Sequence, residues 1–125
     1  MSNLENAQRL QQWIGEGKSM EALNEFYHEN VQVYEMPTGE CRNGREEQRK
    51  AVQEWFGMVK ERHDGGCNSV MADEANNVTC AESWVEVTTQ DGNRMKMEEV
   101  AVQKWQDGKI IEEKFYYNMP APPQS

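Results

Sequence analysis

The stretch NRMKMEEVAVQKWQDGKIIEEKFYYN, residues 93–118, decides the fold. It contains two runs rich in β-branched and aromatic residues, and the dipeptide Asp107-Gly108 separates them. Asp-Gly between such runs is among the strongest short-range signals for a β-hairpin, so we predict two long antiparallel strands. Four carboxylates interrupt this core-like pattern: Glu98, Glu99, Glu112 and Glu113. A carboxylate on a buried face must be paired, protonated or functional, so a site is expected in this hairpin.

The geometry of the turn determines which of these glutamates faces the interior. A two-residue turn places Val102 opposite Glu113. The more apolar face of the hairpin, which we predict to be the interior one, then carries Glu98, Val100, Val102, Ile111, Glu113, Phe115 and Tyr117. A three-residue bulged loop would shift the pairing by one residue and place Glu99 beside Phe115. Glu113 is thus assigned to the interior, whereas the choice between Glu98 and Glu99 stays open.

The opposite face of the predicted hairpin is also too apolar to face water. Its apolar residues are Met97, Ala101, Trp105, Ile110 and Tyr116. Because surfaces of this kind usually mark an interface, we predict a homodimer in which two sheets pack face to face.

The composition excludes several classes of partner. The chain has 125 residues, enough for one hydrophobic core and one domain. Its 22 acidic residues outnumber its 13 basic ones and give a net charge of −9, whereas nucleic-acid binding needs clustered Lys and Arg. No apolar run approaches the roughly 20 residues that span a bilayer, and the polar start has no signal-peptide core. We expect a soluble, cytoplasmic protein with no nucleic-acid or membrane partner.

The cysteines and histidines give no sign of a metal or redox site. Three cysteines, Cys41, Cys67 and Cys80, cannot all pair within one chain, and their irregular spacing matches no zinc or redox motif. His28 and His63 lie far apart in the sequence, and each follows a predicted helix, where a cation is favoured. We therefore expect reduced thiols, no metal and no cofactor.

Two short helices and a strand are predicted at the start of the chain. Apolar residues at three- and four-residue spacing predict a helix that follows an N-cap at Asn3 and ends near residues 15–17. Ser19 opens a second helix. Residues 31–36 alternate as a strand. Its buried face carries Val31, Val33 and Glu35.

A long helix and further strands follow. The helix is predicted over residues 45–62 and ends at the sequence HDGG. Its apolar stripe consists of Val52, Trp55, Phe56 and Val59. Residues 67–72 form a weak strand and residues 78–89 a long one, and Asp91-Gly92 turns the chain into the opening hairpin. Helices on one face of an antiparallel sheet make an α+β domain, and residues 119–125, which include three prolines, form a frayed tail.

This order of elements, together with two stretches of sequence, resembles a known superfamily. The stretches are FYHENVQVYEMPTGECRNGREE near the front and WQDGKIIEEKFYYN at the end. They resemble the nuclear transport factor 2-like superfamily and, within it, the SnoaL-like branch of polyketide cyclases and ketosteroid isomerase relatives. The resemblance covers nearly the whole chain and implies a single domain over residues 1–125. It also implies a cone, in which a curved antiparallel or mixed sheet wraps around the long helix as in a cystatin-like α+β roll.

The resemblance further implies positions for catalytic groups. Ketosteroid isomerases place a general-base Asp before a Pro at the end of the first strand. Counting from Tyr27, this position falls on Glu35, whereas counting back from Pro37 it falls on Met36, which has no acid-base chemistry. SnoaL-like cyclases place an acid-base carboxylate on the last strand, and Glu113 is the closest match. Their partner on the preceding strand is typically a His, which this chain lacks there.

Two functions from different classes remain. The first is a small isomerase-type or cyclase-type enzyme that uses Glu35 and Glu113 without a cofactor on a small hydrophobic molecule, because burial and a neighbouring carboxylate raise a carboxyl pKa toward neutrality. The second is a non-catalytic ligand-binding or dimerisation module in which these glutamates are structural. The predicted ligand pocket consists of Trp13, Tyr27, Trp55, Phe56, Val59, Glu98, Val102, Phe115 and Tyr117.

Overall fold

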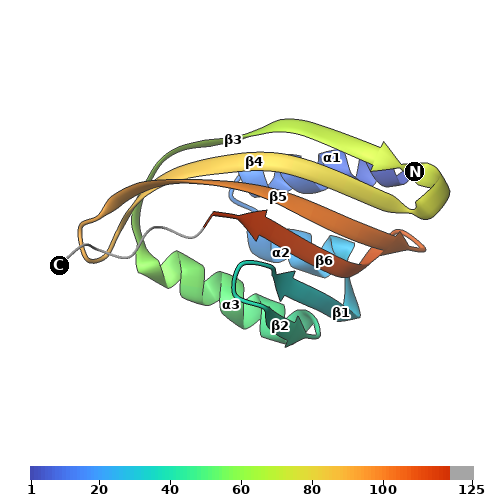
Figure 1. Cartoon of the computed structure of the whole chain (residues 1–125), viewed down its shortest axis with the longest axis horizontal. Helices are drawn as coiled ribbons and strands as arrows, with labels where there is room; N and C mark the ends of the chain where they lie inside the picture. The colour runs from blue at the N-terminus through green and yellow to red at the C-terminus, as the bar shows by residue number, and fades with distance from the viewer. Residues whose placement is uncertain (119–125) are drawn as a thin grey trace.

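The computed structural model describes residues 1–118 and consists of helices on one face of a single sheet (Figure 1). The helices are α1 (Asn3–Gly15), α2 (Ser19–Phe26) and α3 (Arg45–Met58), with a short 3₁₀ helix, η1 (Glu74–Asn76). The strands are β1 (Tyr27–Glu35), β2 (Glu40–Asn43), β3 (Val59–Asp73), β4 (Val78–Thr89), β5 (Arg94–Gln106) and β6 (Lys109–Tyr117). The predicted tail at residues 119–125 lies outside the described residues.

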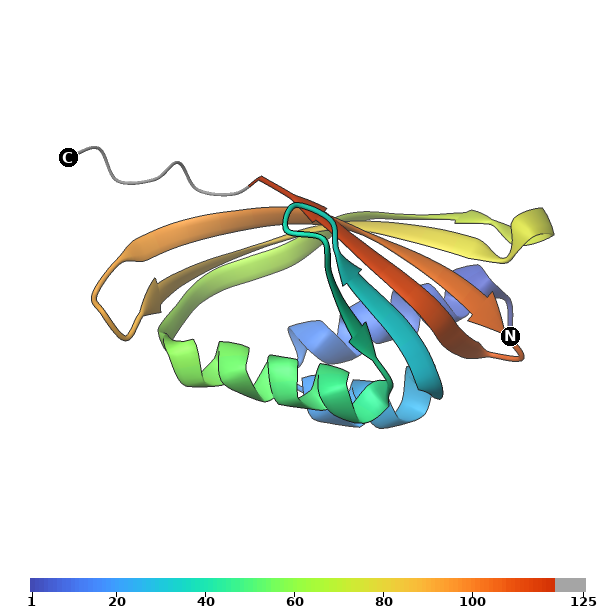
Figure 2. The ribbon, with the colours of Figure 1, turned by 60° about the horizontal axis from the view of Figure 1, so that its bottom comes forward.

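The sheet is mixed, curved and unclosed. Its six strands follow the order β2-β1-β6-β5-β4-β3. β1 and β6 run parallel, and the other neighbouring pairs are antiparallel. The sheet arches over the helices (Figure 2), and we call the side that faces them the concave face and the other side the outer face. The predicted α+β fold with a curved sheet is therefore confirmed.

The hydrophobic core lies between α1, α2 and the half of the sheet that ends at the β5-β6 turn. At its centre, the ring of Phe26 lies edge-on to Trp13 at 5.2 Å between centroids and to Trp105 at 6.5 Å. Four further core side chains are at most 1% exposed: Leu10, Val31, Val33 and Ile110. Core side chains therefore fill the space between the sheet and the first two helices at this end.

The β5-β6 hairpin begins as predicted and then changes register. Both residues of the two-residue turn have positive φ, 51° and 77°, as this type of turn requires. A bulge at Ile111 then shifts the pairing, so that Gln103 rather than Val102 lies opposite Glu113. Neither predicted pairing is correct beyond the turn, because an extra residue in one strand reverses the face of every later side chain relative to its partner strand.

The bulge exchanges the two faces of β5. The residues predicted to face the interior from this strand lie on the outer face: Glu98, Val100 and Val102. The side chain of Glu98 is 72% exposed. Of the residues predicted to form the dimer surface, four belong to the concave side: Met97, Ala101, Trp105 and Ile110. Tyr116 does lie on the outer face, where it is 43% exposed, and the homodimer itself stays a prediction.

The long helix is shorter than predicted, and the strand after it is longer. α3 ends at Met58 rather than Arg62, and residues 63–66 lie inside β3 instead of ending a helix. β3 begins at once because Val59 pairs with Thr89 at the end of the long strand β4. Pairing with a neighbouring strand outweighs the helix propensity of Lys60, Glu61 and Arg62. The bounds of β4 agree with the prediction, whereas β2 was not predicted.

The N-terminus of α1 is capped twice. Ser2, rather than the predicted Asn3, is the N-cap, and its hydroxyl accepts a hydrogen bond from the Glu5 amide at 3.1 Å. The carboxylate of Glu74 in η1 accepts hydrogen bonds from the amides of Asn3 and Leu4, each at 3.1 Å. It satisfies two of the free amides of the helix end and ties α1 to the β3-β4 connection.

Replacing Glu74 by Ala should destabilise the fold by about 1 kcal/mol, because two helix-end amides lose their acceptor and the helix dipole loses a favourable charge. Urea denaturation measures this difference. Glu54→Ala, on the exposed side of α3, is the matched control and should change the free energy of unfolding by less than about 0.5 kcal/mol. Equal effects of the two substitutions would contradict the role of Glu74 as a cap of α1.

Candidate active site on the concave face

Three carboxylates from three strands come together on the concave face. Alternate residues of β6, from Glu113 to Tyr117, point to this side. Phe115, between them, lies beside Glu35 of β1 in the sheet register. Tyr117 lies opposite Glu99 of β5. The sheet register therefore brings the three glutamates together around the C-terminal half of β6.

Glu113 is the most deeply buried of the three. It is 1% exposed, and its carboxylate accepts hydrogen bonds from the Tyr27 hydroxyl and, at 2.8 Å, from Nε2 of Gln103. Burial raises the pKa of Glu113 to about 7, and the two hydrogen bonds oppose the rise because they favour the charged form. Both oxygens of this carboxylate are therefore engaged, away from water.

Glu99 differs because its carboxylate accepts no hydrogen bond within residues 1–118. Burial, followed by the negative charges of Glu113 and Glu35, raises the pKa of Glu99 to about 7. The residue is half-buried and is part of the lining of the cavity at the end of β6. A carboxyl group with a pKa near 7 takes up and releases protons at neutral pH. The choice that the sequence left open is thus decided, since Glu99 and not Glu98 belongs to the concave face.

Glu35 is held by an ion pair. Its carboxylate lies 2.9 Å from the guanidinium of Arg42 on β2, and the two side chains are 19% and 11% exposed. Arg42 also donates through Nε to the side chain of Gln48 on α3 at 2.7 Å. This second contact fixes the orientation of the guanidinium. Among the described residues, Glu35 is the one of the three carboxylates with a direct cationic partner.

Tyr117 provides a hydroxyl beside the carboxylates. Burial, followed by the negative charge of Glu35, raises the pKa of Tyr117 to about 12. The phenol therefore remains protonated at neutral pH and can donate a hydrogen bond to a ligand oxygen.

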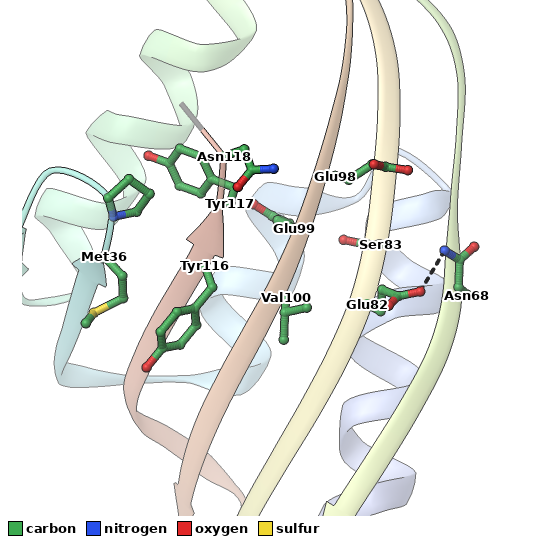
Figure 3. A pocket seen from close by; sticks show the side chains of 11 residues that line it. Met36, Asn68, Glu82, Ser83, Glu98, Glu99, Val100, Tyr116, Tyr117 and Asn118 are labelled. Atoms are coloured by element: carbon green, nitrogen blue, oxygen red, sulfur yellow. Dashed lines mark hydrogen bonds between the residues drawn. The ribbon is translucent and has the colours of Figure 1, made fainter. Parts of the chain in front are cut away.

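A cavity of about 640 Å³ opens where β6 ends, and it includes two residues of this group (Figure 3). Its lining comes from β3 to β6 and from the loop after β1: Met36, Pro37, Asn68, Glu82, Ser83, Glu98, Glu99, Val100, Tyr116, Tyr117 and Asn118. Much of this lining belongs to the outer face, whereas the carboxylate cluster belongs to the concave face. The two features meet at Glu99 and Tyr117, and Glu99 extends from β5 toward β6.

The residues predicted to line a pocket fall into separate groups. Three lie beside the carboxylates: Tyr27, Phe115 and Tyr117. Trp13 packs against Phe26 in the core. Two lie on the outer face: Glu98 and Val102. Three lie at the end of α3 and the start of β3: Trp55, Phe56 and Val59. Phe56 is 50% exposed there, and which of these residues touch a ligand stays a prediction.

The sequence interpretation missed Arg42 and Gln103 and left Glu99 undecided. A signal for β5 was present in the sequence. Glu99 and Gln103 share one face of the strand with Ala101 and Trp105, two residues that prefer burial. Reliance on the turn alone assigned this alternation to the wrong face. Arg42 lies in a segment rich in Gly that was assigned to a loop, so no local signal identified it.

Neither a metal site nor a membrane span is found in the described part of the chain. Within residues 1–118, no group of three or more His, Cys, Asp or Glu side chains is arranged to hold a metal ion. No helix of this region is long and apolar enough to cross a membrane. Cys41, Cys67 and Cys80 are free thiols.

The fold and the sequence identify the family. The sequence profile of the SnoaL-like domain matches residues 1–117, which is nearly the whole chain. The chain therefore belongs to the SnoaL-like family of the nuclear transport factor 2-like superfamily. No curated protein gives a significant match to the sequence.

Solved structures share the fold over most of its length. A protein from Mesorhizobium loti, described as a SnoaL-like polyketide cyclase, is 26% identical with a TM-score of 0.82, and the match covers 94% of this chain and 100% of that one. A nuclear transport factor 2-like protein from Burkholderia pseudomallei is 13% identical with a TM-score of 0.77 over 94% and 92% of the two chains. A protein from Rhodopseudomonas palustris, described as an isomerase, is 12% identical with a TM-score of 0.70 over 94% and 90%.

The raised pKa of Glu113 predicts a specific dependence of stability on pH. Its folded-state pKa of about 7 lies above the ordinary 4.5, so the folded protein binds this proton more tightly than the unfolded chain. The resulting stability is fully present below about pH 4.5 and is lost as the pH rises to about 7. For Glu113 alone this loss amounts to roughly 3 kcal/mol.

The variant Glu113→Gln cannot ionise, so its free energy of unfolding should fall less between pH 5 and pH 8 than that of the wild type, as measured by urea denaturation. Glu98→Gln, on the outer face, is the control and should retain the wild-type pH dependence. An unchanged pH dependence in Glu113→Gln would show that Glu113 is not held in a desolvated position.

Proposed function

We propose that this protein binds a small, mainly apolar and uncharged molecule and catalyses a cofactor-free proton transfer on it, of isomerase or cyclase type. The observation that carries the proposal is the cluster of Glu35, Glu99 and Glu113 on one face, with burial raising the pKa of Glu99 and Glu113 to about 7. General acid-base catalysis is most effective when the pKa of the group lies near the working pH.

Glu99 is the carboxylate suited to contact the substrate. Its oxygens are free, whereas Glu113 is engaged by Tyr27 and Gln103 and Glu35 by Arg42. In the proposed reaction, Glu99 removes a proton from a carbon next to a carbonyl and returns it to another atom of the same molecule.

Two further groups have supporting roles in this reaction. Tyr117 donates a hydrogen bond to the oxygen on which negative charge develops, which stabilises the intermediate. Glu35 and Glu113, the pair predicted from the sequence, supply the negative charges that raise the pKa of Glu99. They thereby keep Glu99 a strong enough base for the task.

The charges of the cluster define the class of ligand. The cluster contains three carboxylates, and Arg42 beside it is already paired with Glu35, so an anionic ligand is repelled at close range. The adjoining cavity of about 640 Å³ is in the range for drug-sized ligands, about 300–1,000 Å³. Its apolar lining includes Met36, Pro37 and Val100, which suits a flat, neutral molecule with a carbonyl group.

Family relatives support the same class of reaction. The Mesorhizobium loti protein is described as a SnoaL-like polyketide cyclase and the Rhodopseudomonas palustris protein as an isomerase. Both names denote reactions within one molecule. A shared fold does not by itself transfer a reaction, so the carboxylates carry the proposal.

A non-catalytic ligand-binding or dimerisation module is the second candidate. It is favoured by the complete burial of Glu113 together with Gln103, each 1% exposed, because a fully hydrogen-bonded buried network can serve stability alone. In that case Glu99 contributes only to the charge of the cavity.

Binding should discriminate between neutral and anionic ligands of the same shape. In a thermal-shift screen of flat cyclic ketones and their carboxylate analogues, neutral compounds should raise the Tm and the analogues should not, because ligand that binds the folded state stabilises it by mass action. Preference for the carboxylates would contradict the proposed ligand class.

Catalysis should appear as hydrogen exchange at carbon. The protein should accelerate incorporation of deuterium next to the carbonyl of bound ketones in D₂O, followed by NMR. The rate should rise with pH through about 7, as Glu99 loses its proton, and level off above that. Glu99→Gln should lose about 100-fold or more of this rate while still binding the ketone. Glu54→Gln, exposed on α3 and outside the lining of the cavity, is the control and should keep the full rate.

Retention of binding with no exchange in the wild type would favour the non-catalytic module. Equal loss of exchange in Glu54→Gln and Glu99→Gln would show that the concave face is not the site of chemistry.

A further inference from the structure

A chain of buried hydrogen bonds links the hydrophobic core to Glu113. Trp105 donates through Nε1 to the hydroxyl of Thr79 at 2.7 Å, and this hydroxyl donates to Oε1 of Gln103 at 2.8 Å. Nε2 of Gln103 then donates to Oε2 of Glu113 at 2.8 Å. Each of these four residues is at most 2% exposed, so water cannot substitute for any link.

The hydrogen bonds of this chain have only one favourable direction, from Trp105 to Glu113. An indole N–H donates and never accepts, so Thr79 must accept from Trp105 and direct its own proton elsewhere. The carbonyl oxygen of Gln103 accepts that proton, which turns the NH₂ group of Gln103 toward Glu113. The orientation of the Gln103 amide is therefore set from the core end.

We infer that Trp105, Thr79 and Gln103 act as positioning residues that keep a hydrogen-bond donor on Oε2 of Glu113 and so favour its charged form against the effect of burial, which leaves Glu99 as the carboxyl that exchanges a proton with the substrate. The role given to Glu99 rests on the proposed function, whereas the charge state of Glu113 does not. Glu113 then acts through its charge and never as the group that contacts substrate.

Protonation of Glu113 would break the chain. A neutral carboxyl that donates toward Gln103 needs the amide to flip, which turns the NH₂ group toward Thr79. Thr79 would then accept twice and leave its own proton without an acceptor, and an unsatisfied buried donor costs about 1–3 kcal/mol. On the other oxygen, Oε1, a proton would displace the hydrogen bond that the Tyr27 hydroxyl donates there.

The remaining charged groups around Glu113 do not replace this control. Glu35 on β1 raises its pKa, and Arg42 on β2 lowers it, but these two are paired with each other at 2.9 Å. Glu99 on β5 adds a further negative charge when it is ionised. The effects of this pair on Glu113 largely cancel, so the two donors on its oxygens are the main influence that opposes burial.

The test is a titration of the glutamate carboxyl carbons by ¹³C NMR in the wild type, Thr79→Val and Thr79→Ser. Glu99→Gln and Glu113→Gln identify the two signals. Thr79→Val keeps the shape of the side chain but removes the hydroxyl, so the amide is free to flip. The titration midpoint of Glu113 should rise by about one pH unit and that of Glu99 should fall. Thr79→Ser restores the hydroxyl and should give the wild-type midpoints.

A purely structural role for the chain predicts lower stability in Thr79→Val with both midpoints unchanged, and that result would overturn the inference. An equal displacement of the midpoints in Thr79→Ser would overturn it as well. If Thr79→Val does not fold, Trp105→Phe removes only the first donor and should displace both midpoints in the same directions by a smaller amount, and unchanged midpoints there would reject the inference. Because the readout needs no substrate, it is independent of whether the proposed reaction occurs.

Discussion

The site depends on the placement of one carboxylate, that of Glu113, where water does not reach. A buried charge is costly unless polar partners replace its hydration, and Gln103 and Tyr27 do so here. The support for these partners comes from the core itself. Trp105 packs its ring against Phe26 and donates its N–H to Thr79, so one side chain belongs both to the hydrophobic core and to the polar network. The packing of the core therefore also positions the polar groups of the site.

A single extra residue in β6 brings the polar groups together. With the bulge at Ile111, Gln103 lies opposite Glu113 and Glu99 lies opposite Tyr117. An unbroken ladder would have placed Val102 at the first of these positions and left Glu113 without a donor from β5. Bulges are often found next to active sites because they re-aim side chains without changing the topology of the sheet.

The three glutamates are chemically equivalent in the sequence and different in the fold. Glu113 is hydrogen-bonded, Glu35 is ion-paired with Arg42, and Glu99 is free at its oxygens. The proposed role of Glu99 rests on this difference, because its carboxylate is the one without a hydrogen bond or an ion pair among the described residues. Membership of the SnoaL-like family establishes the fold, and the reaction is argued from these residues because one fold serves many functions.

The sequence by itself determined the features that depend on neighbouring residues. The order of the helices and long strands, the turn at Asp107-Gly108 and the bounds of β4 follow from periodicity and turn chemistry, which act over a few residues. The tertiary structure decided the end of α3 and the choice between Glu98 and Glu99. Both depend on pairing with strands distant in the sequence, where one bulged residue reverses a face and a long neighbouring strand converts the end of a helix into sheet.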